Sequence, residues 1–578
     1  MSRASAAPGF TAAIPAWRQL FETGGADALL LAWYGDGSEP GWRGRYLSAL
    51  DRFVDDFGGA GEVAIARCPA QMNIMGMHID YCGMPSLRLA IRGADTITVA
   101  RAVDGDRVRL RSRLENGTRF PDVDFAMREM VPAADVSTRE GIMAYAGEVC
   151  SRRERETGSA LDSHWDIIPE GGLIFLDGYL RRTGAAGGVG GMDAAVWSNV
   201  SPSGGMSSSS ALLVSTAYAA LGAYGLDPKI AVGEEDLVDG LGSSEWLRGT
   251  RGGTADHGGM IMGRGGSLVS VGVFPAQSAG RAPLPEGYAP VILDSMVPRV
   301  YDEAAKEETV AAYPLGTFVI RELLLPELSG AGGHPAFAGL ASGYAERIHY
   351  LRDLSAARLG VGTGAICQLL AGLPATASLR EIAEWAGKAG REDAYERMLE
   401  SEIAGKYQHL GPDVPIHLRR RVTFALAEQS RVEHMVTLIA AGRMQEVLEL
   451  IRISHAGDRD REVELPELEG LQRRVEAGEE GLGLALVPGG YGRMTEAYDR
   501  VVGRINDYLQ SSPLAEAGAV QRLGAGWGGN IGGLVRTEML SGPMAVEFRR
   551  FLQDELGLED VPHPTVPGEG ACLVPAPD

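Results

Sequence analysis

Residues 198–221 read SNVSPSGGMSSSSALLVSTAYAAL and carry the strongest local signal in the chain. The pattern predicts a strand that ends near Val200, a loop of glycine and serine, and a helix that starts near Ala211. Four consecutive serines at the N-terminus of a helix would combine free backbone N–H groups, hydroxyls and the positive end of the helix dipole. A single serine there would be an ordinary helix cap. Four serines after Pro-x-Gly-Gly favour a phosphate site, although the chain contains no G-x-x-x-x-G-K-[ST] loop.

A second glycine-rich segment, RGTRGGTADHGGM, covers residues 248–260 and leaves space around the carboxylate of Asp256. Arg248 and Arg251 could keep this carboxylate ionised, as a general base needs when it accepts a proton from an alcohol. An aspartate that only makes a turn hydrogen bond is the alternative interpretation.

The third segment, QRLGAGWGGNIGGLV, covers residues 521–535 and contains the G-x-G-x-x-G spacing. A dinucleotide-binding version should follow a strand and open a helix, whereas these glycines precede a strand-like run at 531–535. Fewer than fifty residues follow, too few for the rest of such a fold. A glycine loop against a phosphate or a neighbouring backbone is the remaining interpretation.

Two polar residues, His78 and Asp80, lie in the otherwise apolar stretch GMHIDYCG at residues 76–83. They predict either a satisfied structural pair or a loop that presents both groups to a hydroxylated ligand. The chain has no HExxH and no His/Cys cluster, so a zinc site has little support.

The composition excludes several classes of protein. The chain has 578 residues and 76 Asp and Glu against 54 Lys and Arg, a net charge of −22, which argues against binding to nucleic acid or anionic lipid. No run approaches 18 apolar residues, so no membrane span is expected. The N-terminal stretch lacks the features of a signal peptide, and five cysteines without CxxC spacing favour reduced thiols. These features predict a cytoplasmic protein.

Periodicity predicts how the chain is organised. We expect a helical N-terminal extension at 1–60, an N-terminal lobe at 61–285 that begins with a strand, and a C-terminal lobe at 286–578 that is mostly helical over 300–455. Residues 95–112 predict a hairpin around Asp104-Gly105-Asp106, and residues 113–165 an insertion. Arg419 to Ala441 predicts a long amphipathic helix.

These segments, in this order and with the early HxDY, resemble the GHMP small-molecule kinases, and the galactokinases most closely. CPAQMNIMGMHIDYCGMPSLRLAI at 68–91 looks like the galactokinase sugar-binding signature, and SPSGGMSSSSAL resembles the phosphate-binding second motif. RGGTADHGGMIMGRGGSLVSV resembles the segment with the catalytic aspartate, and RLGAGWGGNIGGLV the C-terminal glycine motif. The likeness runs from about residue 62 onward, interrupted by insertions.

The resemblance implies an α/β (α+β) fold of two lobes, S5-like and ferredoxin-like, with ATP and substrate bound between them. Asp256 would be the catalytic base, Arg251 and Gln71 the other catalytic positions, and Glu245 a Mg²⁺ ligand. Sugar-binding positions carried over from the family are His78, Asp80, Tyr81, Asn73 and Gly83. The phosphate-binding positions are Gly204, Gly205, Ser207, Ser208, Ser209 and Ser210. Ser209 would also bind Mg²⁺. Because the motif is one residue shorter here than is usual in the family, Ser210 could take the place of Ser209. Gly524, Gly526, Gly528 and Gly529 would shape the floor of the site.

Three departures from the family pattern matter. Gln71 stands where galactokinases place an arginine close to the transferred phosphate, which removes a positive charge unless Arg251 or another cation replaces it. Met77 stands for the glutamate that contacts the sugar's terminal hydroxymethyl, which favours a substrate that is apolar, altered or truncated at that carbon. Glu245 lies one position late, with Ser244 in the expected place of the metal-binding glutamate.

The leading hypothesis is therefore an ATP-dependent kinase that phosphorylates a hydroxyl, with the anomeric one expected, on galactose or a related or modified sugar. A non-catalytic sensor of nucleotide and sugar on the same fold is the alternative that Gln71 favours, and the retained Asp256 argues against it. A kinase for a non-sugar alcohol such as mevalonate is a third hypothesis. Oligomeric state is left open.

Overall fold

The computed structural model describes residues 9–35, 39–130, 135–138, 141–142, 144–146, 148–149, 165–202, 204–248, 252–300, 302–330, 333, 335–338, 347–403, 407, 409–479, 481–492, 494–524 and 526–577. The chain divides into two compact units. The first comprises Met1–Met72, Arg88–Arg281 and Thr565–Asp578, and the second comprises Asn73–Leu87 and Ala282–Pro564. Among the described residues, no helix combines the length and apolar character needed to cross a membrane.

The first unit is built on a mixed sheet whose main path runs β1, β2, β3, β6, β4, β5; β13 pairs with β2, and β7 with β3 and β8. Its strands are β1 (Thr11–Ala13), β2 (Glu62–Met75), β3 (Ser86–Ala102), β4 (Arg107–Leu114), β5 (Val123–Ala126), β6 (Met192–Ser198), β7 (Ser267–Gly272), β8 (Gln277–Pro283) and β13 (Cys572–Leu573). The long β2 and β3 are apolar runs buried over most of their length, as expected for central strands covered on both faces.

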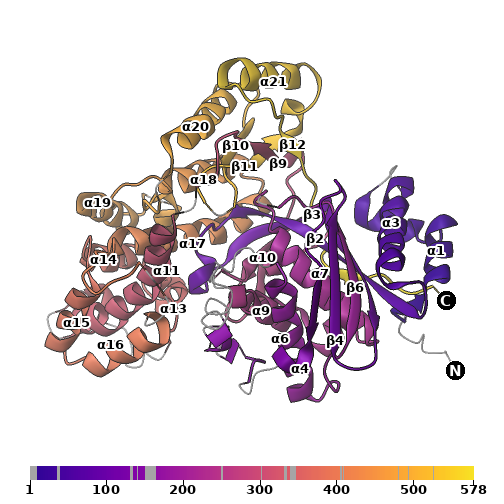
Figure 1. The fold of residues 1–578 in the computed structure, drawn as a ribbon. Coiled ribbons are helices and arrows are strands. Elements are labelled where there is room, and N and C mark those ends of the chain that lie inside the picture. Colours follow the sequence, from indigo (N-terminus) through magenta and orange to yellow (C-terminus); the bar gives the residue numbers. More distant parts are fainter. Residues whose placement is uncertain are drawn as a thin grey trace, which may run out of the picture. The chain divides into compact units, whose positions relative to one another are not determined.

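Helices cover both faces of this sheet (Figure 1). α1 (Ile14–Glu22), α2 (Asp27–Tyr34) and α3 (Glu39–Phe57) lie on one side, and α6 (Ile167–Thr183), α7 (Ser208–Ala223), α9 (Glu234–Ser244) and α10 (Ala255–Ile261) on the other. The short helices α4 (Met127–Met130) and α8 (Pro228–Ala231) belong to the same unit. α1 to α3 confirm the helical pattern expected for the N-terminal extension, and β1 is a strand that the sequence did not predict.

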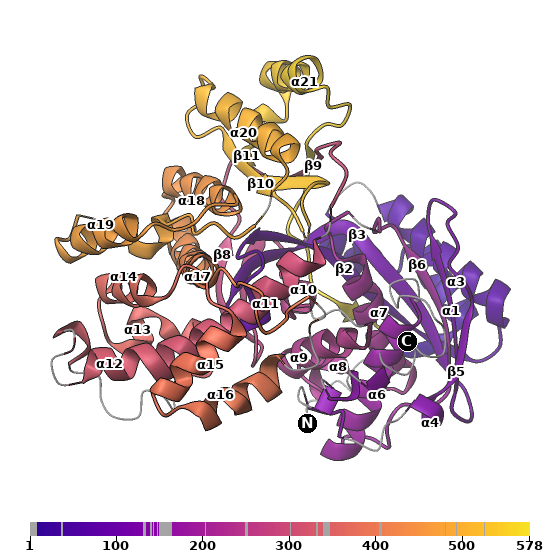
Figure 2. The ribbon, with the colours of Figure 1, turned by 60° about the vertical axis from the view of Figure 1, so that its left-hand side comes forward.

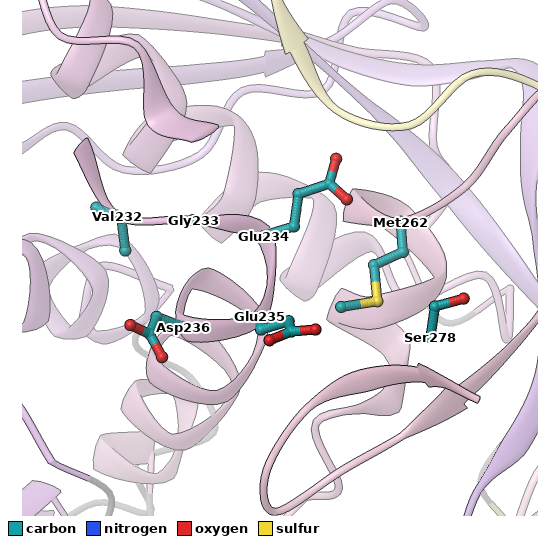
Figure 3. Close-up of a pocket in the computed structure, with 7 residues that line it drawn as sticks. All are labelled: Val232, Gly233, Glu234, Glu235, Asp236, Met262 and Ser278. Carbon is teal, nitrogen blue, oxygen red and sulfur yellow. The ribbon is translucent and has the colours of Figure 1, made fainter. Parts of the chain in front are cut away.

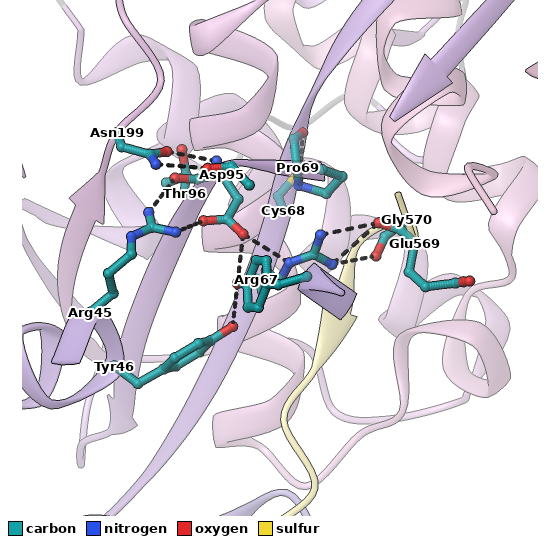
Figure 4. A network of polar contacts seen from close by, with 12 residues as sticks. Arg45, Tyr46, Arg67, Cys68, Pro69, Asp95, Thr96, Asn199, Glu569 and Gly570 are labelled. Atoms are coloured by element: carbon teal, nitrogen blue, oxygen red, sulfur yellow. Dashed lines mark hydrogen bonds and ion pairs between the residues drawn. The ribbon is translucent and has the colours of Figure 1, made fainter. Parts of the chain in front are cut away.

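A buried ionic network joins α3 to the sheet (Figure 4). Asp95 of β3 accepts hydrogen bonds from Arg45 of α3 and, at 2.9 Å, from Nε of Arg67 on β2. Nη1 of Arg67 also donates to the carbonyl oxygens of Glu569 and Gly570, each at 3.2 Å. Burial alone would raise the pKa of Asp95, but the charges of Arg45 and Arg67 outweigh it and hold that pKa below its usual value.

The hairpin predicted at residues 95–112 is wrong in its pairing. Both strands exist as β3 and β4, but β6 lies between them, antiparallel to β3 and parallel to β4. β4 instead forms its antiparallel pair with β5. The local turn signal cannot reveal a strand that arrives from about 80 residues later in the chain, since pairing partners depend on tertiary contacts.

The second unit contains an antiparallel sheet of order β10, β11, β9, β12, of which β9, β10 and β11 are labelled in Figure 2. The strands are β9 (Tyr288–Asp294), β10 (Gly518–Arg522), β11 (Asn530–Arg536) and β12 (His563–Pro564). Helices α18 (Met444–Gly457), α20 (Glu496–Ser511) and α21 (Gly542–Leu556) accompany it. Side chains from β9, β10, β11, α20 and α21 share one apolar core. The glycine-rich third segment therefore joins two antiparallel strands, which confirms that it is not a dinucleotide fold.

A second apolar core in this unit belongs to a group of helices. They are α11 (Glu303–Phe318), the π-helix η4 (Val319–Leu324), α12 (Leu325–Ser329), α13 (Ala356–Leu359), α14 (Thr363–Gly372), α15 (Leu379–Lys388), α16 (Glu392–Met398), α17 (Leu418–Ala440) and α19 (Leu465–Glu476). α17 confirms the long amphipathic helix predicted for residues 419–441, and the described residues confirm that 300–455 is mostly helical.

Candidate active site

The centre of the candidate site in the first unit is the carboxylate of Asp256, in the first turn of α10. The hydroxyl of Ser207 donates a hydrogen bond to its Oδ2. Nε2 of Gln71 donates to Oδ1 at 3.2 Å, and Nη1 of Arg88 forms an ion pair with the same oxygen. The structure thus brings together two residues predicted as catalytic, one predicted phosphate ligand and an arginine that the sequence analysis did not select.

Gln71 bridges the members of this cluster. Its Nε2 donates to the hydroxyl of Ser207 at 2.9 Å, and its Oε1 accepts from Nη1 of Arg88 at 2.9 Å. Gln71 lies on β2 and Arg88 on β3, which are neighbouring strands of the sheet. Gln71 is 2% exposed and Arg88 4%, whereas the side chain of Asp256 is 33% exposed. A buried cation therefore lies under a carboxylate that remains open to solvent.

The helix that carries Asp256 packs closely on these strands because of a glycine. A Cβ atom at Gly259 of α10 would lie 3.2 Å from Cβ of Arg88 and 3.4 Å from Cβ of Gln71. The contact with Arg88 is tighter than ordinary van der Waals packing, and the one with Gln71 is at its lower limit. Gly259 therefore lets the first turn of α10 approach the two strands that supply the amide and the guanidinium.

The serine loop leads directly into α7, which begins at Ser208, three residues earlier than predicted. Gly205 and Ser207 both have positive φ, +73° and +59°, so the chain turns sharply before the helix. Ser208, Ser209 and Ser210 then form the first turn, where the backbone N–H groups have no acceptor within the helix. These serines, with Gly204 in the loop before them, lie where the sequence analysis expects an anion site, and that site stays a prediction.

Glu245 reaches the serine loop although it lies one position late in the sequence. Its Oε2 accepts a hydrogen bond from the hydroxyl of Ser210 at 3.1 Å and lies 3.3 Å from Nε2 of the buried His257. Burial favours a higher pKa for Glu245, but His257, Ser209 and the charge of Arg248 outweigh it and lower the pKa to about 2. The carboxylate is therefore ionised at neutral pH.

The donor atoms around Glu245 fit a magnesium ion held partly by substrate. One ionised carboxylate and two serine hydroxyls are oxygen donors, and Mg²⁺ is commonly held by one or two carboxylates together with phosphate oxygens and water. The part of the chain that the structure describes contains no group of three or more His, Cys, Asp and Glu side chains able to hold a metal by themselves.

In the second unit, a buried glutamate holds the loop that follows β2. Oε1 of Glu428 on α17 accepts from the backbone N–H groups of Gly76 and Met77, at 2.9 and 3.3 Å, and from the hydroxyl of Ser454 at 2.8 Å. Its Oε2 pairs with Nε of Arg431 at 2.6 Å, and both side chains are fully buried. Glu428 therefore fixes the backbone immediately before His78.

His78 has a positive φ of +62°, and its ring stacks on Tyr491 with the centroids 4.8 Å apart. Arg522 of β10 donates to Nε2 of His78 and forms an ion pair with Asp458. The hydroxyl of Tyr313 donates to the carbonyl oxygen of His78 at 2.8 Å. Burial raises the pKa of Asp458 to about 7, against the lowering effect of Arg522. His78 is thus fixed by three contacts: the stacking of its ring on Tyr491, the hydrogen bond from Arg522 to Nε2, and the hydrogen bond from Tyr313 to its carbonyl oxygen.

The other predicted sugar-binding positions lie in the same unit. Asp80 is 6% exposed and opens the short helix η1 (Asp80–Cys82), which also contains Tyr81. Gly83 ends that helix with a φ of +80° and accepts from Nη1 of Arg352 at 2.8 Å. Oδ1 of Asn73 is buried and has no hydrogen-bond partner among the described residues.

The C-terminal glycine motif packs against a neighbouring backbone. Trp527 and Val300 exchange backbone hydrogen bonds of 2.9 and 3.0 Å, and a Cβ at Gly528 would lie 2.4 Å from the carbonyl oxygen of Pro298. Positive φ angles occur at each predicted glycine: Gly524, Gly526, Gly528 and Gly529. The sequence left open whether this loop lies against a phosphate or against a neighbouring backbone, and the structure shows it packed against the backbone of residues 298–300.

Several site residues were missed or fall elsewhere. Arg251, predicted as catalytic, lies outside the described residues. Arg88, Glu428 and Arg522 were not selected from the sequence. The signal for Arg88 was a single charged residue inside the apolar strand SLRLAI, whereas Glu428 and Arg522 are recognisable only from their tertiary contacts.

A separate pocket lies at the N-terminus of α9 in the first unit (Figure 3). It is lined by Val232, Gly233, Glu234, Glu235, Asp236, Met262 and Ser278. None of the predicted site residues lines it. Glu234 in this pocket is paired with Lys229 and Arg264, so its charge is already compensated within the chain.

Comparisons with known proteins agree with this arrangement. Residues 51–101 match the galactokinase galactose-binding signature, and residues 175–264 match the GHMP kinases N terminal domain. A galactokinase of Candida albicans is 27% identical over 187 residues, which cover 32% of this chain and 31% of that protein. The aligned region thus spans about a third of that relative's length.

A solved structure shows the same fold. The galactokinase of Lactococcus lactis, complexed with galactose, superposes with a TM-score of 0.55 at 17% identity and covers 91% of this chain and 99% of its own. At this identity the likeness concerns the fold alone. It confirms the predicted mixed α/β class of the fold.

Proposed function

Because this chain carries the GHMP kinase N-terminal domain and the galactokinase galactose-binding signature, we propose that it is an ATP-dependent sugar kinase. The acceptor is a hydroxyl, the anomeric one by resemblance, of galactose or a related or modified monosaccharide. The observation that carries the proposal is the cluster in the first unit. In it, the Asp256 carboxylate accepts a hydrogen bond from the hydroxyl of Ser207, immediately before the N-terminus of α7, and pairs with the Arg88 guanidinium.

In the proposed reaction, a sugar hydroxyl oxygen forms a bond to the γ-phosphorus of ATP. The bond between that phosphorus and the β–γ bridging oxygen breaks, and its electron pair leaves with ADP. Asp256 accepts the proton of the attacking hydroxyl, a role that its partly exposed carboxylate permits. Phosphoryl transfer otherwise requires mainly positioning and charge neutralisation.

The serine loop would hold the phosphates of ATP. Gly204, Gly205, Ser207 and Ser208 would supply backbone N–H groups and hydroxyls at the N-terminus of the 16-residue helix α7. Ser209 or Ser210, with Glu245, would hold Mg²⁺, whose contribution when bound is to neutralise phosphate charge. The contact between Ser210 and Glu245 supports this assignment despite the shifted position of the glutamate.

The loop after β2 would hold the sugar. His78 and Asp80 would bind hydroxyls, with Tyr81 and Gly83 shaping the loop. The buried and unpartnered Oδ1 of Asn73, as found in the described part of the chain, supports a hydrogen-bond donor from a ligand at that position.

The test is Mg-ATP turnover against a panel of free sugars, with mass spectrometry of the products. The panel includes galactose, arabinose, uronic acids, amino sugars and deoxysugars. Transfer of one phosphate to one of them is the expected result. Binding of ATP and sugar without any product would favour the non-catalytic sensor, and turnover of mevalonate but of no sugar would favour the non-sugar alcohol kinase.

Met77 gives a prediction about the sugar. A buried thioether cannot accept a hydrogen bond as strongly as an amide or carboxylate, so we expect Met77→Gln to shift the ratio of kcat/KM for galactose over 6-deoxygalactose upward by about tenfold or more. Both sugars are measured with the wild type, with Met77→Gln and with Met296→Gln, an exposed methionine of the same unit that serves as the control. An unchanged ratio in Met77→Gln would show that this side chain does not face the terminal carbon.

A further inference from the structure

The cluster around Asp256 contains one guanidinium among the described residues, and it comes from Arg88 on β3 rather than from position 71 on β2. Arg88 places Nη1 against Oδ1 of Asp256 and, at 2.9 Å, against Oε1 of Gln71. A transferred phosphoryl group spreads negative charge over its oxygens, and a carboxylate base adds another negative charge beside it. A cation at this position is therefore needed by the proposed chemistry.

The burial of Arg88 favours a role in chemistry over one in packing. Its side chain is 4% exposed in a run whose neighbours, Leu87, Leu89 and Ala90, are apolar and fully buried. A guanidinium in such a place costs desolvation energy, and an apolar side chain of similar volume is often as stable or more stable there. Once in place, its positive charge is screened less by salt than a surface charge would be.

We infer that Arg88 is a catalytic residue of the proposed kinase reaction: its guanidinium orients the Asp256 carboxylate and neutralises charge on the transferred phosphoryl group. The inference rests on the proposed function. It also explains Gln71. The amide oxygen of Gln71 accepts from Arg88 while its N–H group donates to Ser207 and Asp256. An arginine at position 71 could donate but not accept, and it would bring a second positive charge to Arg88.

Gln71 and Arg88 thus form a matched pair, and exchanging them is the sharpest test. Four variants are compared with the wild type: Arg88→Gln, Gln71→Arg, the double exchange Gln71→Arg/Arg88→Gln, and Arg101→Gln. Arg101 is the matched control, because it lies on the same strand and pairs with a buried aspartate, Asp193, at 2.7 Å. Thermal melting verifies that each variant is folded.

For turnover of the sugar that the panel identifies, we expect Arg88→Gln to lower kcat by about 10²- to 10³-fold. Gln71→Arg alone should also lower kcat, because it places two cations together. The double exchange should recover at least about tenfold over Arg88→Gln, since one cation and one amide are again present. Arg101→Gln should stay within about threefold of the wild type.

A second readout does not depend on turnover. The affinity for ADP with Mg²⁺ and aluminium fluoride, a mimic of the transferred phosphoryl group, is compared with the affinity for ADP and Mg²⁺ alone by calorimetry. We expect the wild type to prefer the fluoride complex by about a hundredfold, a preference within the range of transition-state analogues. Arg88→Gln should lose most of that preference and bind ADP as before, and the double exchange should regain it.

The two hypotheses fail in different ways. A wild type that phosphorylates no sugar contradicts the proposed function, whereas a wild type that shows no preference for aluminium fluoride contradicts the role of Arg88. The inference is overturned if folded Arg88→Gln keeps both its turnover and its fluoride preference within about threefold of the wild type. If Arg88→Gln does not fold, the double exchange decides: a folded double variant without recovered preference also overturns it.

Discussion

Asp256→Asn should lower kcat by about a thousandfold while ATP binding stays within about threefold of the wild type. Asparagine keeps the shape of the side chain and can still accept from Arg88 and pair with Ser207. It cannot take the proton of the attacking hydroxyl, so only the chemical step loses its base. Single-turnover rates with the sugar found in the panel, together with ATP titration by calorimetry, separate the two effects.

Asp124→Asn is the control for this experiment. Asp124 is also an ion-paired aspartate of the first unit, but its partners are Arg107 and Arg111, with Nη1 of Arg111 at 2.8 Å. It should keep wild-type turnover. If Asp256→Asn retains more than about a tenth of the wild-type kcat, then Asp256 is not the base.

The second large effect concerns stability. Asp95→Asn should destabilise the first unit by about 3–5 kcal/mol, because it leaves the guanidinium groups of Arg45 and Arg67 buried without their shared counter-charge. Urea unfolding monitored by tryptophan fluorescence is the measurement, since Trp17 and Trp33 lie in the core that α1, α2 and α3 share with the sheet. Asp51→Asn, which removes an exposed partner of Arg18, should change stability by less than about 1 kcal/mol.

The same substitution has a pH signature. The pKa of Asp95 is lowered in the folded protein, so its ion pairs contribute stability fully above the unfolded value and lose that contribution as the pH falls through the still lower folded value. The stability difference between wild type and Asp95→Asn should therefore be largest at neutral pH and shrink in strong acid. A difference that stays constant with pH, or one no larger than that of Asp51→Asn, would contradict the network.

Local patterns predicted the elements near the site well. The serine run became the first turn of α7, the glycine-rich segment of Asp256 became the start of α10, and the third glycine segment joined two strands. In each case the signal lies within about twenty consecutive residues, where capping, backbone freedom and periodicity act directly. The domain boundaries at 60/61 and 285/286 stay predictions.

Contacts between distant segments were beyond reach of those patterns. β6 enters between β3 and β4, and Arg88 meets Asp256 across 168 residues of sequence. Glu428 meets Gly76 across 352 residues. A single charged residue in an apolar strand, such as Arg88, indicates that a buried polar partner is present, but the pattern does not identify that partner.

The tail of the chain has a consequence for how the protein is made. Residues 572–573 pair with β2 as β13, Val574 is fully buried in the core of α1 to α3, and Arg67 donates to the carbonyls of Glu569 and Gly570. On the ribosome, the first unit therefore lacks an edge strand and acceptors for a buried arginine until some 280 further residues of the second unit have been synthesised. During that interval its sheet edge is unprotected, so translation speed and chaperone access, rather than the stability of the finished sheet, should govern the yield of folded protein.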